Sequence, residues 1–418
     1  MALKKRLVVI GGGAAGFFCA VNAARLNQDL EVILIEKSSK LLSKVKVSGG
    51  GRCNVTHACF DITEMSRKYP RGGNFVKKTF HQFFTTDTIQ WFQERGVALK
   101  TEADGRMFPV TNSSQTVIDC LLKEVNRYAV QIRMNAEVIE VINNTPGLLI
   151  KFAKGEELTT DFICIATGGY PKVAMFDWLK SLGHTCEDPV PSLFTFNLPG
   201  DQPGMPRHPI TELMGVSVEN VQVKINGTRL EQEGPLLITH WGLSGPAVLK
   251  LSAWGARELK ARNWEFNVNV NWLPGRNEQE LAGQFQTLRF DIATQKVGNK
   301  NPFGLPQRLW EFLLDQSQVN KDKRWADLAV KEQNKLVQNL CRSLFEVRGK
   351  TTFKEEFVTA GGIRLNEIDP NTMMSKKVPG IFFAGEVMDV DGITGGFNFQ
   401  HAWTSGFIAA KAIASVGN

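Results

Sequence analysis

Residues 6–16 of this 418-residue chain read RLVVIGGGAAG, an apolar run that passes directly into closely spaced glycines. The run RLVVI (6–10) predicts a buried strand, and the alanine-rich segment 14–26 predicts a helix. A second apolar run, LEVILI (30–35), predicts a neighbouring strand. A strand, a helix and a strand within about thirty residues predict a parallel βαβ unit, and so an α/β fold.

The glycines of this unit suit a turn that binds phosphate. Gly11, Gly13 and Gly16 satisfy the pattern G-x-G-x-x-G. The first allows the turn, the second lets a pyrophosphate approach the backbone, and the third allows close helix–strand packing. The helix that follows offers unpaired N–H groups, and Glu36, at the end of the second strand, can accept hydrogen bonds from ribose hydroxyls. We therefore predict a dinucleotide site; the alternative is a glycine turn that only packs.

Two later predicted strands also end in glycine-bearing turns. They are ICIATGG (163–169) and IFFAGEV (381–387). Because ligands of such sheets lie outside the carboxyl ends of the strands, these turns can reach a long extended cofactor. A nicotinamide dinucleotide would need only the first crevice, so three such turns favour FAD, with Glu386 or Asp389 near its ribityl chain. Two ordinary glycine turns at strand ends are the alternative.

The segment GITGGFNFQHAWTSG (392–406) extends this interpretation. A helix that starts after the Gly-Gly pair can direct backbone N–H groups from Gly396 to Asn398 at the flavin pyrimidine edge, where negative charge grows on reduction. His401 on this helix is a candidate catalytic residue. A helix that only docks Trp403 and Phe407 into the core is an alternative compatible with the first.

The most unusual string is KVSGGGRCNVTH (46–57). Its three consecutive glycines allow close backbone approach, and Arg52 offers a fixed cationic fork. Cys53 and Asn54 add a thiol and an amide, so we expect the string to contact cofactor or substrate. A redox disulfide between Cys53 and Cys59 and a packed thiol at Cys53 are both open.

His240 lies in THWGLSGPAVLKLS (239–252), where glycines interrupt a strand pattern. It is a candidate proton donor or substrate ligand, or else stabilises a turn. The sequence contains neither H-E-x-x-H nor G-x-S-x-G, so we expect no metal and no serine-hydrolase chemistry. It contains no second G-x-G-x-x-G motif between a strand and a helix. NADH or NADPH would therefore reach the flavin only transiently, or electrons would come from the substrate or another protein.

The organisation of the chain changes in its middle. Six prolines between 189 and 209 suit a linker, the residues from 216 to 270 alternate like strands, and those from 277 to about 344 have helical periodicity. We predict a discontinuous FAD-binding domain, formed by residues 1–190 together with residues 351–418. Between these two segments we predict an inserted β domain (191–275) and a helical domain (276–350).

Charge and cysteine content bear on partners and location. The net charge of +7 permits a polyanionic partner such as RNA. The cations of 67–71 with Lys77, Lys78 and His81, together with Lys44, Lys46 and Arg52, could form a positive approach, or else a solvated surface. The seven cysteines are odd in number and contain no C-x-x-C pair, so we expect a reduced, cytoplasmic location. The uncharged stretches 7–24 and 392–410 contain glycines or polar residues, so we expect no membrane span. The oligomeric state is not readable.

Four strings together resemble the BaiN/RdsA family of NAD(P)/FAD-dependent oxidoreductases, the YhiN-like flavoproteins. They are GGGAAG, SGGGRCNVTH, THWGLSGPAVLKLS and AGEVMDVDGITGGFNFQHAWTSG, and they span the chain. The resemblance implies a glutathione-reductase-like FAD-binding Rossmann domain with an inserted β domain and a small helical domain. Family members are associated with reduction of conjugated C=C bonds in steroid-like substrates, with dihydrouridine formation in large-subunit ribosomal RNA, and with oxidation of small amines such as aminoacetone.

The resemblance also implies which residues contact FAD. These are Gly11, Gly13, Ala15, Gly16, Glu36, Arg52, Asn54, Thr167, Gly168, Gly385, Glu386, Gly396 and Asn398. The expected cofactor site further includes Ala14, Lys37, Gly51, Cys53, Val138, Ala166, Asp389, Gly395 and Phe397. DVDGITGGFN stands where the RNA-modifying branch would have a string like TGWLGGYN, and His401 stands where it would have tryptophan. The branch, and with it the substrate, stays open.

Our leading hypothesis is hydride transfer from reduced FAD to an activated C=C bond, with His240, Cys53 and His401 as catalytic candidates. The alternatives are a dihydrouridine synthase that acts on large-subunit ribosomal RNA, an amine oxidase of the aminoacetone-oxidase type, and a non-catalytic FAD-containing RNA-binding protein.

Overall fold

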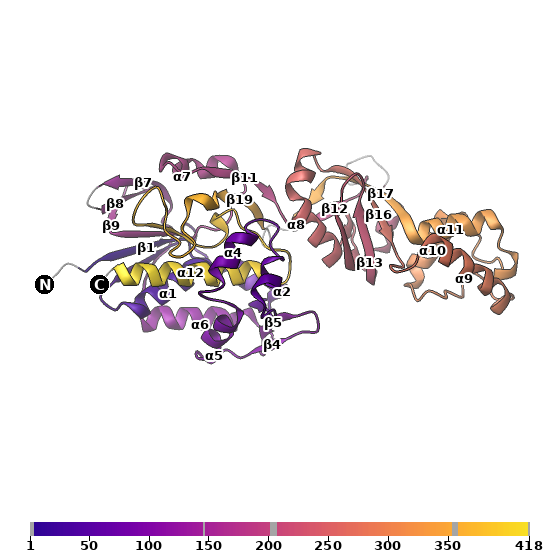
Figure 1. Ribbon diagram of the computed structural model, residues 1–418, viewed down its shortest axis with the longest axis horizontal. Coiled ribbons are helices and arrows are strands. Elements are labelled where there is room, and N and C mark those ends of the chain that lie inside the picture. The colour runs from indigo at the N-terminus through magenta and orange to yellow at the C-terminus, as the bar shows by residue number, and fades with distance from the viewer. Residues whose placement is uncertain (1–3, 145–146, 201–206, 353–357, 417–418) are drawn as a thin grey trace. The chain divides into compact units, whose positions relative to one another are not determined.

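The structure, a computed structural model, describes residues 4–144, 147–200, 207–352 and 358–416. The chain forms two compact units (Figure 1). Unit 1 comprises Met1–Ser192 and Phe353–Asn418, and unit 2 comprises Leu193–Thr352. Unit 1 is therefore built from both ends of the chain, and unit 2 is an insertion into it.

The centre of unit 1 is a parallel five-stranded sheet with strand order β20-β10-β1-β2-β6. Its strands are β1 (Arg6–Ile10), β2 (Glu31–Ile35), β6 (Gln131–Arg133), β10 (Phe162–Ile165) and β20 (Ile381–Phe383). The apolar runs of β1 and β2 are almost wholly buried, as in parallel sheets covered on both faces. The order places the carboxyl ends of β1, β2 and β10 side by side.

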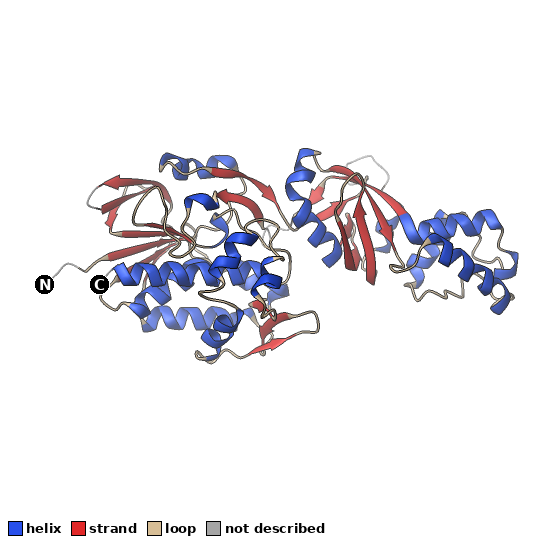
Figure 2. Cartoon of the chain, viewed as in Figure 1, coloured by secondary structure: helices blue, strands red, loops and turns tan. Residues whose placement is uncertain are grey.

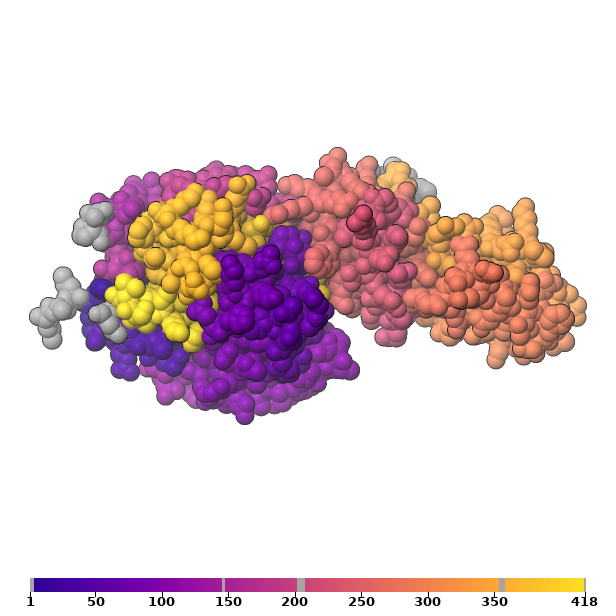
Figure 3. Space-filling model, viewed as in Figure 1, coloured from indigo at the N-terminus to yellow at the C-terminus, as the bar shows by residue number. Residues whose placement is uncertain are grey.

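Helix α1 (Ala14–Leu26) follows β1 and packs along α12 (Phe397–Val416), the last helix of the chain. A Cβ atom at Gly406 would lie 2.7 Å from the Ala15 carbonyl oxygen, so the two helices need glycine at this crossing. The buried Phe18 ring lies 5.2 Å from the Trp403 ring across the same contact. N-terminal and C-terminal segments accordingly lie together on the surface of unit 1 (Figure 3).

The other helices and strands of unit 1 surround this sheet and helix pair (Figure 2). Its helices also include α2 (Ser43–Gly51), α3 (Ile62–Ser66), α4 (Gly73–Thr79), α5 (Thr85–Gln93), α6 (Ser114–Arg127) and α7 (Asp177–Ser181). One three-stranded sheet contains β3 (Thr56–His57), β5 (Arg106–Pro109) and β4 (Leu99–Thr101), and another contains β7 (Val138–Asn144), β8 (Gly147–Phe152) and β9 (Glu157–Thr160).

An antiparallel ribbon carries the chain out of unit 1 and back into it. It pairs β11 (Cys186–Pro191) with β19 (Thr359–Ile363). The Ser192 N–H, directly after β11, donates to the Val358 carbonyl at 2.8 Å. The two crossings between the units are thus hydrogen-bonded to each other inside unit 1.

Unit 2 contains a seven-stranded sheet with strand order β17-β16-β13-β14-β15-β12-β18. Its strands are β12 (Thr195–Asn197), β13 (Ser217–Ile225), β14 (Glu231–Ile238), β15 (Gly242–Ser244), β16 (Glu265–Asn271), β17 (Ser343–Arg348) and β18 (Lys350–Thr351). Its helices are α8 (Pro246–Ala261), α9 (Glu278–Asp291), α10 (Gln307–Gln316) and α11 (Val330–Arg342).

The predicted helical domain (276–350) contains a strand near its end, after the segment with helical periodicity (277 to about 344). Residues 343–348 form β17, which pairs with β16 along six residues. The string SLFEVR alternates between buried and exposed side chains, which is the period of a strand. Its position directly after α11 hid this short alternation from a sequence reading. The separation of unit 2 into a β domain and a helical domain stays a prediction.

Among the described residues, every helix is too short or too polar to cross a lipid bilayer.

Candidate active site

The N-terminus of α1 is open. Gly13 precedes the helix without a side-chain cap, and a Cβ atom there would meet nothing within 4 Å. Gly11 has φ +121°, and a Cβ atom on it would lie 2.3 Å from the Ala166 carbonyl oxygen. The predicted turn at 166–168 therefore packs directly on the first glycine turn. The free N–H groups of α1 face open space beside both turns, which suits a pyrophosphate.

Glu36 is held at the end of β2 by its own neighbours. Its Oε2 accepts the Gly12 N–H at 2.9 Å, and its Oε1 accepts both the N–H and the hydroxyl of Ser38 at 2.8 Å. These bonds orient the carboxylate beside the glycine turn, where the sequence predicted a ribose ligand.

A cleft of about 310 Å³ opens next to Glu36. Four of the predicted cofactor residues besides Glu36 line it: Gly11, Lys37, Val138 and Thr167. The cleft lies at the carboxyl ends of β1 and β2, where adenosine would follow the pyrophosphate.

Three further residues of this cleft were missed by the sequence reasoning. Tyr170, Met175 and Trp178 line it, and the Trp178 indole N–H donates to the Tyr170 hydroxyl at 3.3 Å. They come from the segment YPKVAMFDW that follows the second glycine turn. The signal in the sequence that could have identified this side of the cleft is the presence of aromatic residues directly after a turn at the end of a strand.

The third glycine turn meets the first. A Cβ atom at Gly385 would lie 2.8 Å from the Ala15 Cβ atom, at the start of α1. Glu386 accepts from Lys44 Nζ at 2.6 Å and from the Thr359 N–H at 2.8 Å, while Asp389 accepts from the Gly361 N–H at 3.1 Å. Both carboxylates therefore bond to protein groups, and their contact with a ribityl chain stays a prediction.

The second half of the site begins in α2. Gly49, Gly50 and Gly51 all have positive φ, between +59° and +83°, and Cβ atoms at Gly50 and Gly51 would meet nothing within 4 Å. The backbone is therefore left uncovered there. Arg52 donates to the Gly49 carbonyl at 3.2 Å, pairs with Glu102 at 2.5 Å and lies over the Phe108 ring at 4.1 Å.

Asn54 and His57 join this segment to the start of α12. With the Asn54 amide oriented to suit both neighbours, it donates to the Thr56 carbonyl and accepts the Gly396 N–H, both at 3.0 Å. His57 Nδ1 lies 2.9 Å from the Gly395 carbonyl oxygen, and its ring stacks on Phe397 at 4.6 Å. The structure thus brings together the two glycine-rich strings, from opposite ends of the sequence.

Asn398 closes the loop before α12. Its amide accepts the Gly392 N–H at 2.8 Å and donates to the Gly392 carbonyl at 3.0 Å. The side chain therefore shapes the loop, and its contact with the cofactor stays a prediction.

The three catalytic candidates lie in different environments. Burial raises the pKa of Cys53 to about 12, with a Ser48 hydrogen bond opposing the shift, and both Cys53 and Cys59 are free cysteines. Burial lowers the pKa of His401 to about 4; its Nε2 lies 3.3 Å from the Gly385 carbonyl oxygen. His240 is exposed, lies between β14 and β15 of unit 2, and its ring contacts Trp241 at 4.0 Å.

Four of the cations expected to form a positive approach lie in ion pairs. Lys44 pairs with Glu386, Arg52 with Glu102 and Arg67 with Glu64. Arg71 lies in a buried ion pair with Asp391. The sequence could not show these pairings because most of the carboxylates come from distant segments.

The residues of unit 1 fit FAD. The open helix start at Gly13, the uncovered backbone at Gly50 and the carboxylate of Glu36 beside a cleft provide an anion site, room for close approach and a ribose acceptor. All of them lie on one unit whose two halves meet at α1 and α12.

The family model described as the HI0933-like protein Rossmann domain matches residues 5–412. The chain belongs to this family. The 3-dehydro-bile acid delta(4,6)-reductase of Clostridium scindens is 28% identical over 98% of this chain and 99% of that protein. The ribosomal RNA dihydrouridine synthase of Escherichia coli is 32% identical over 97% of this chain and 96% of that protein.

Two solved enzymes share the fold. A 3-ketosteroid-delta4-(5alpha)-dehydrogenase from Rhodococcus jostii RHA1 matches 98% of each chain with 12% identity and a TM-score of 0.50. A flavocytochrome c3 fumarate reductase covers 100% of this chain and 79% of that chain, with 16% identity and a TM-score of 0.51. The family and the fold confirm the predicted FAD-binding Rossmann domain, and this member of the HI0933-like family is an FAD-dependent oxidoreductase.

Proposed function

We propose that this flavoprotein reduces a C=C bond that is conjugated to a carbonyl group. The substrates in the names of its two relatives both contain such a bond. A 3-dehydro-bile acid with a Δ4 bond carries an alkene conjugated to its 3-oxo group, and uridine carries one conjugated to a ring carbonyl. Hydride addition to such a bond leaves negative charge on the carbonyl oxygen, and a proton completes the reaction.

The observation that carries the proposal is the meeting of Asn54 and Gly396 at the start of α12. Bound FAD would supply a two-electron carrier that accepts and releases hydride. The N–H groups of α1 would hold its pyrophosphate and Glu36 its ribose. The N-terminus of α12, with its positive dipole end, would stabilise the negative charge that grows on reduction.

Of the three catalytic candidates, Cys53 and His401 lie in unit 1, and His240, in unit 2, stays a candidate proton donor on its sequence pattern alone. His401, with its pKa near 4, is neutral at physiological pH and is enclosed in unit 1. Cys53, with its pKa near 12, is a neutral thiol at physiological pH and is fully buried. A general acid works best with a pKa near the working pH, which neither of these two groups has.

The electron donor and the location belong to the same proposal. Because the sequence has a single G-x-G-x-x-G motif, we propose that NADH or NADPH reduces the flavin by transient binding. All seven cysteines are free in the structure, which supports the reducing environment of the cytoplasm.

The test uses the purified protein, which should be yellow. Anaerobic NADH or NADPH should bleach it, and a conjugated enone should restore the colour faster than air does. Rapid reoxidation by air alone would instead favour the amine-oxidase alternative. Bleached protein that neither an enone nor uridine in RNA reoxidises would refute the proposal.

A second candidate substrate is uridine in large-subunit ribosomal RNA. The 32% identity to the Escherichia coli enzyme and the net charge of +7 favour it. The neutralised cations of unit 1 weigh against it. Deletion of the gene, followed by dihydrouridine analysis of ribosomal RNA, decides between them: an unchanged dihydrouridine content excludes this candidate.

A further inference from the structure

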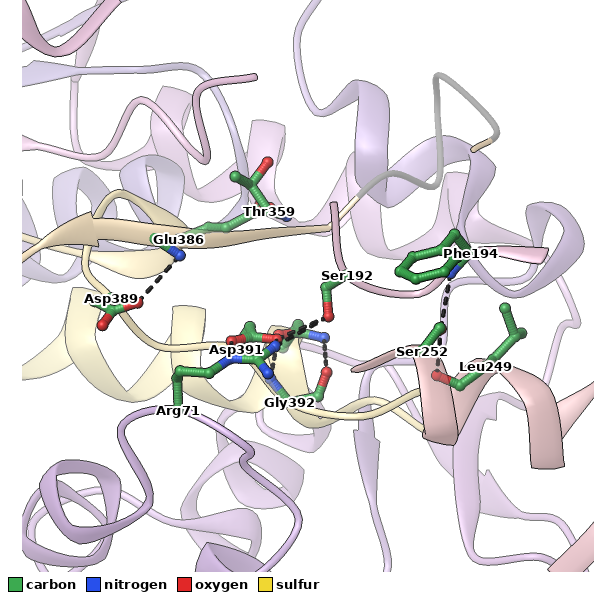
Figure 4. Close-up of polar contacts among 12 residues, drawn as sticks. Arg71, Ser192, Phe194, Leu249, Ser252, Thr359, Glu386, Asp389, Asp391 and Gly392 are labelled. Carbon is green, nitrogen blue, oxygen red and sulfur yellow. Dashed lines mark hydrogen bonds and ion pairs between the residues drawn. The ribbon is translucent and has the colours of Figure 1, made fainter. Parts of the chain in front are cut away.

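Three carboxylates of the segment 385–392 bond to the ribbon that leads into unit 2. Glu386 accepts the Thr359 N–H at 2.8 Å, Asp389 accepts the Gly361 N–H at 3.1 Å, and Asp391 accepts the Ser192 hydroxyl at 2.8 Å (Figure 4). The segment before α12 is therefore tied to both strands of the ribbon, or to residues directly beside them.

Asp391 is the most deeply buried of the three. It has no exposed surface, and Arg71 donates from Nε to its Oδ1 at 2.6 Å and from Nη2 to its Oδ2. Arg71 Nη2 also reaches the Ser192 hydroxyl at 3.3 Å. Burial raises the pKa of the Asp391 carboxyl, and the Arg71 guanidinium opposes that shift.

A buried ion pair contributes little net stability, because desolvation offsets the attraction between the charges. The effect of this ion pair is mainly geometric. The hydrogen bonds among Arg71, Asp391 and Ser192 form together only when the three side chains keep these relative positions. The backbones of Arg71 and Asp391 also form an isolated antiparallel bridge. This cluster therefore fixes where residue 391 lies relative to the ribbon.

The loop that Asp391 begins leads directly to the start of α12. Gly392 is clamped by the Asn398 amide, and Gly396 is bonded to Asn54. The Tyr69 hydroxyl donates to the Phe397 carbonyl at 2.6 Å, from the same segment that carries Arg71. A shift of Asp391 would thus displace the backbone at the start of α12, where the cofactor contact is predicted.

We propose that Asp391 is a positioning residue that holds the 391–398 loop in its FAD-binding form and joins it, through Ser192, to the β11–β19 ribbon. Asp391 acts through the loop and not by touching the substrate. The inference rests on the placement of the flavin ring at the start of α12 in the proposed function.

The experiment compares Ser192→Ala and Asp391→Asn with the wild-type chain and with Ser317→Ala. Ser317 is a matched control: its hydroxyl is also buried and hydrogen-bonded, but it lies in unit 2. Apoprotein is titrated with FAD, and hydrogen exchange of the 391–398 amides is measured without FAD. Ser192→Ala, which removes one hydroxyl, should weaken FAD binding about fivefold and speed hydrogen exchange of the 391–398 amides. Asp391→Asn should weaken FAD binding at least tenfold.

Ser192→Ala keeps the ion pair, so it gives an answer even when Asp391→Asn fails to fold. FAD binding within twofold of wild type, together with unchanged loop exchange in Ser192→Ala, would overturn the proposal. The proposal would also be overturned if Ser192→Ala lost only thermal stability, by the same amount as Ser317→Ala. Neither readout uses a substrate, so a protein that binds FAD but reduces no alkene would defeat the proposed function and leave this result intact.

Discussion

The two ends of the candidate FAD site are built differently. The phosphate end, from β1 to Glu36, is one continuous segment. Within it Gly16 is required by the Gly11 carbonyl, while Gly11 is required by the Ala166 carbonyl of a distant strand end. The ring end joins the string at 49–57 to the loop at 392–398 through bonds such as that from Gly396 to Asn54. The residues of the first end therefore lie in one segment with one distant steric contact, whereas the second end depends on tertiary contacts between two distant segments.

The largest effect should come from the phosphate end. In Gly16→Val a Cβ atom would lie 1.9 Å from the Gly11 carbonyl oxygen, so the helix cannot pack on its strand. We expect FAD affinity to fall more than a hundredfold and unfolding to become easier by about 3 kcal/mol or more. FAD titration and thermal unfolding measure both changes.

Gly13→Ala is the matched control, because a Cβ atom there meets nothing. Its apoprotein should keep its stability within about 0.5 kcal/mol, while the methyl group in the phosphate path lowers FAD affinity about tenfold. Full FAD affinity in this variant would show that no phosphate lies at the start of α1.

Glu36→Ala should have the next largest effect. The carboxylate is oriented by Gly12 and Ser38, and its loss removes charge-assisted bonds to a ribose, which are each worth about 1.5 to 3 kcal/mol. We expect FAD to bind about thirtyfold more weakly, as measured by titration of the apoprotein. An unchanged affinity for FAD, with a lost affinity for NADPH, would assign this end to the nicotinamide cofactor instead.

A smaller effect is expected at the ring end, where several groups share the work. Arg52→Met removes a guanidinium that bonds Gly49 and Glu102, so the exposed glycine backbone loses its support. We expect FAD affinity or the rate of flavin reduction to fall about tenfold.

Arg106→Met is the control for Arg52, because Arg106 also pairs with Glu102 and also lies near the Phe108 ring, at 5.4 Å. It should stay within twofold of the wild-type chain in both measurements. Equal losses in the two variants would mean that the Glu102 ion pairs only stabilise the fold.

The same difference explains what the sequence could predict. The spacing of Gly11, Gly13 and Gly16 predicted the phosphate turn, because the three glycines lie in one short string and Gly16 packs directly on the Gly11 carbonyl. At the ring end the strings were predicted to matter, but the bonds from Asn54 to Gly396 and from His57 to Gly395 depend on how unit 1 closes.

The positions of side chains that bond to residues far away in the sequence were the hardest to predict. Arg71 was grouped with surface cations, but Asp391 from the other end of the chain holds it in the interior. Tyr170 and Trp178 belong to no motif, and only the fold places them in the cleft beside Glu36. Strand β17 was read as belonging to a helical segment, because pairing with β16 overrides the pattern of its neighbours.

The smallest expected effect concerns pH and His401, which lies on α12 between the two ends. Burial holds its pKa near 4, against about 6.5 in an unfolded chain, so the folded ring stays neutral while the unfolded ring takes up a proton. The unfolding free energy of unit 1 should therefore fall as pH decreases from about 6.5 to 4, by about 0.7 kcal/mol between pH 7 and pH 6.

His184, whose pKa burial also lowers, acts in the same direction, so the wild-type curve alone does not isolate His401. His401→Gln keeps His184 and removes only this ring. Hydrogen exchange of the α12 amides in apoprotein at pH 7, 6 and 5, corrected for intrinsic rates, should show a shallower loss of protection in the variant. Parallel curves would mean that His401 takes up its proton in the folded state, which would return it to the group of candidate proton donors.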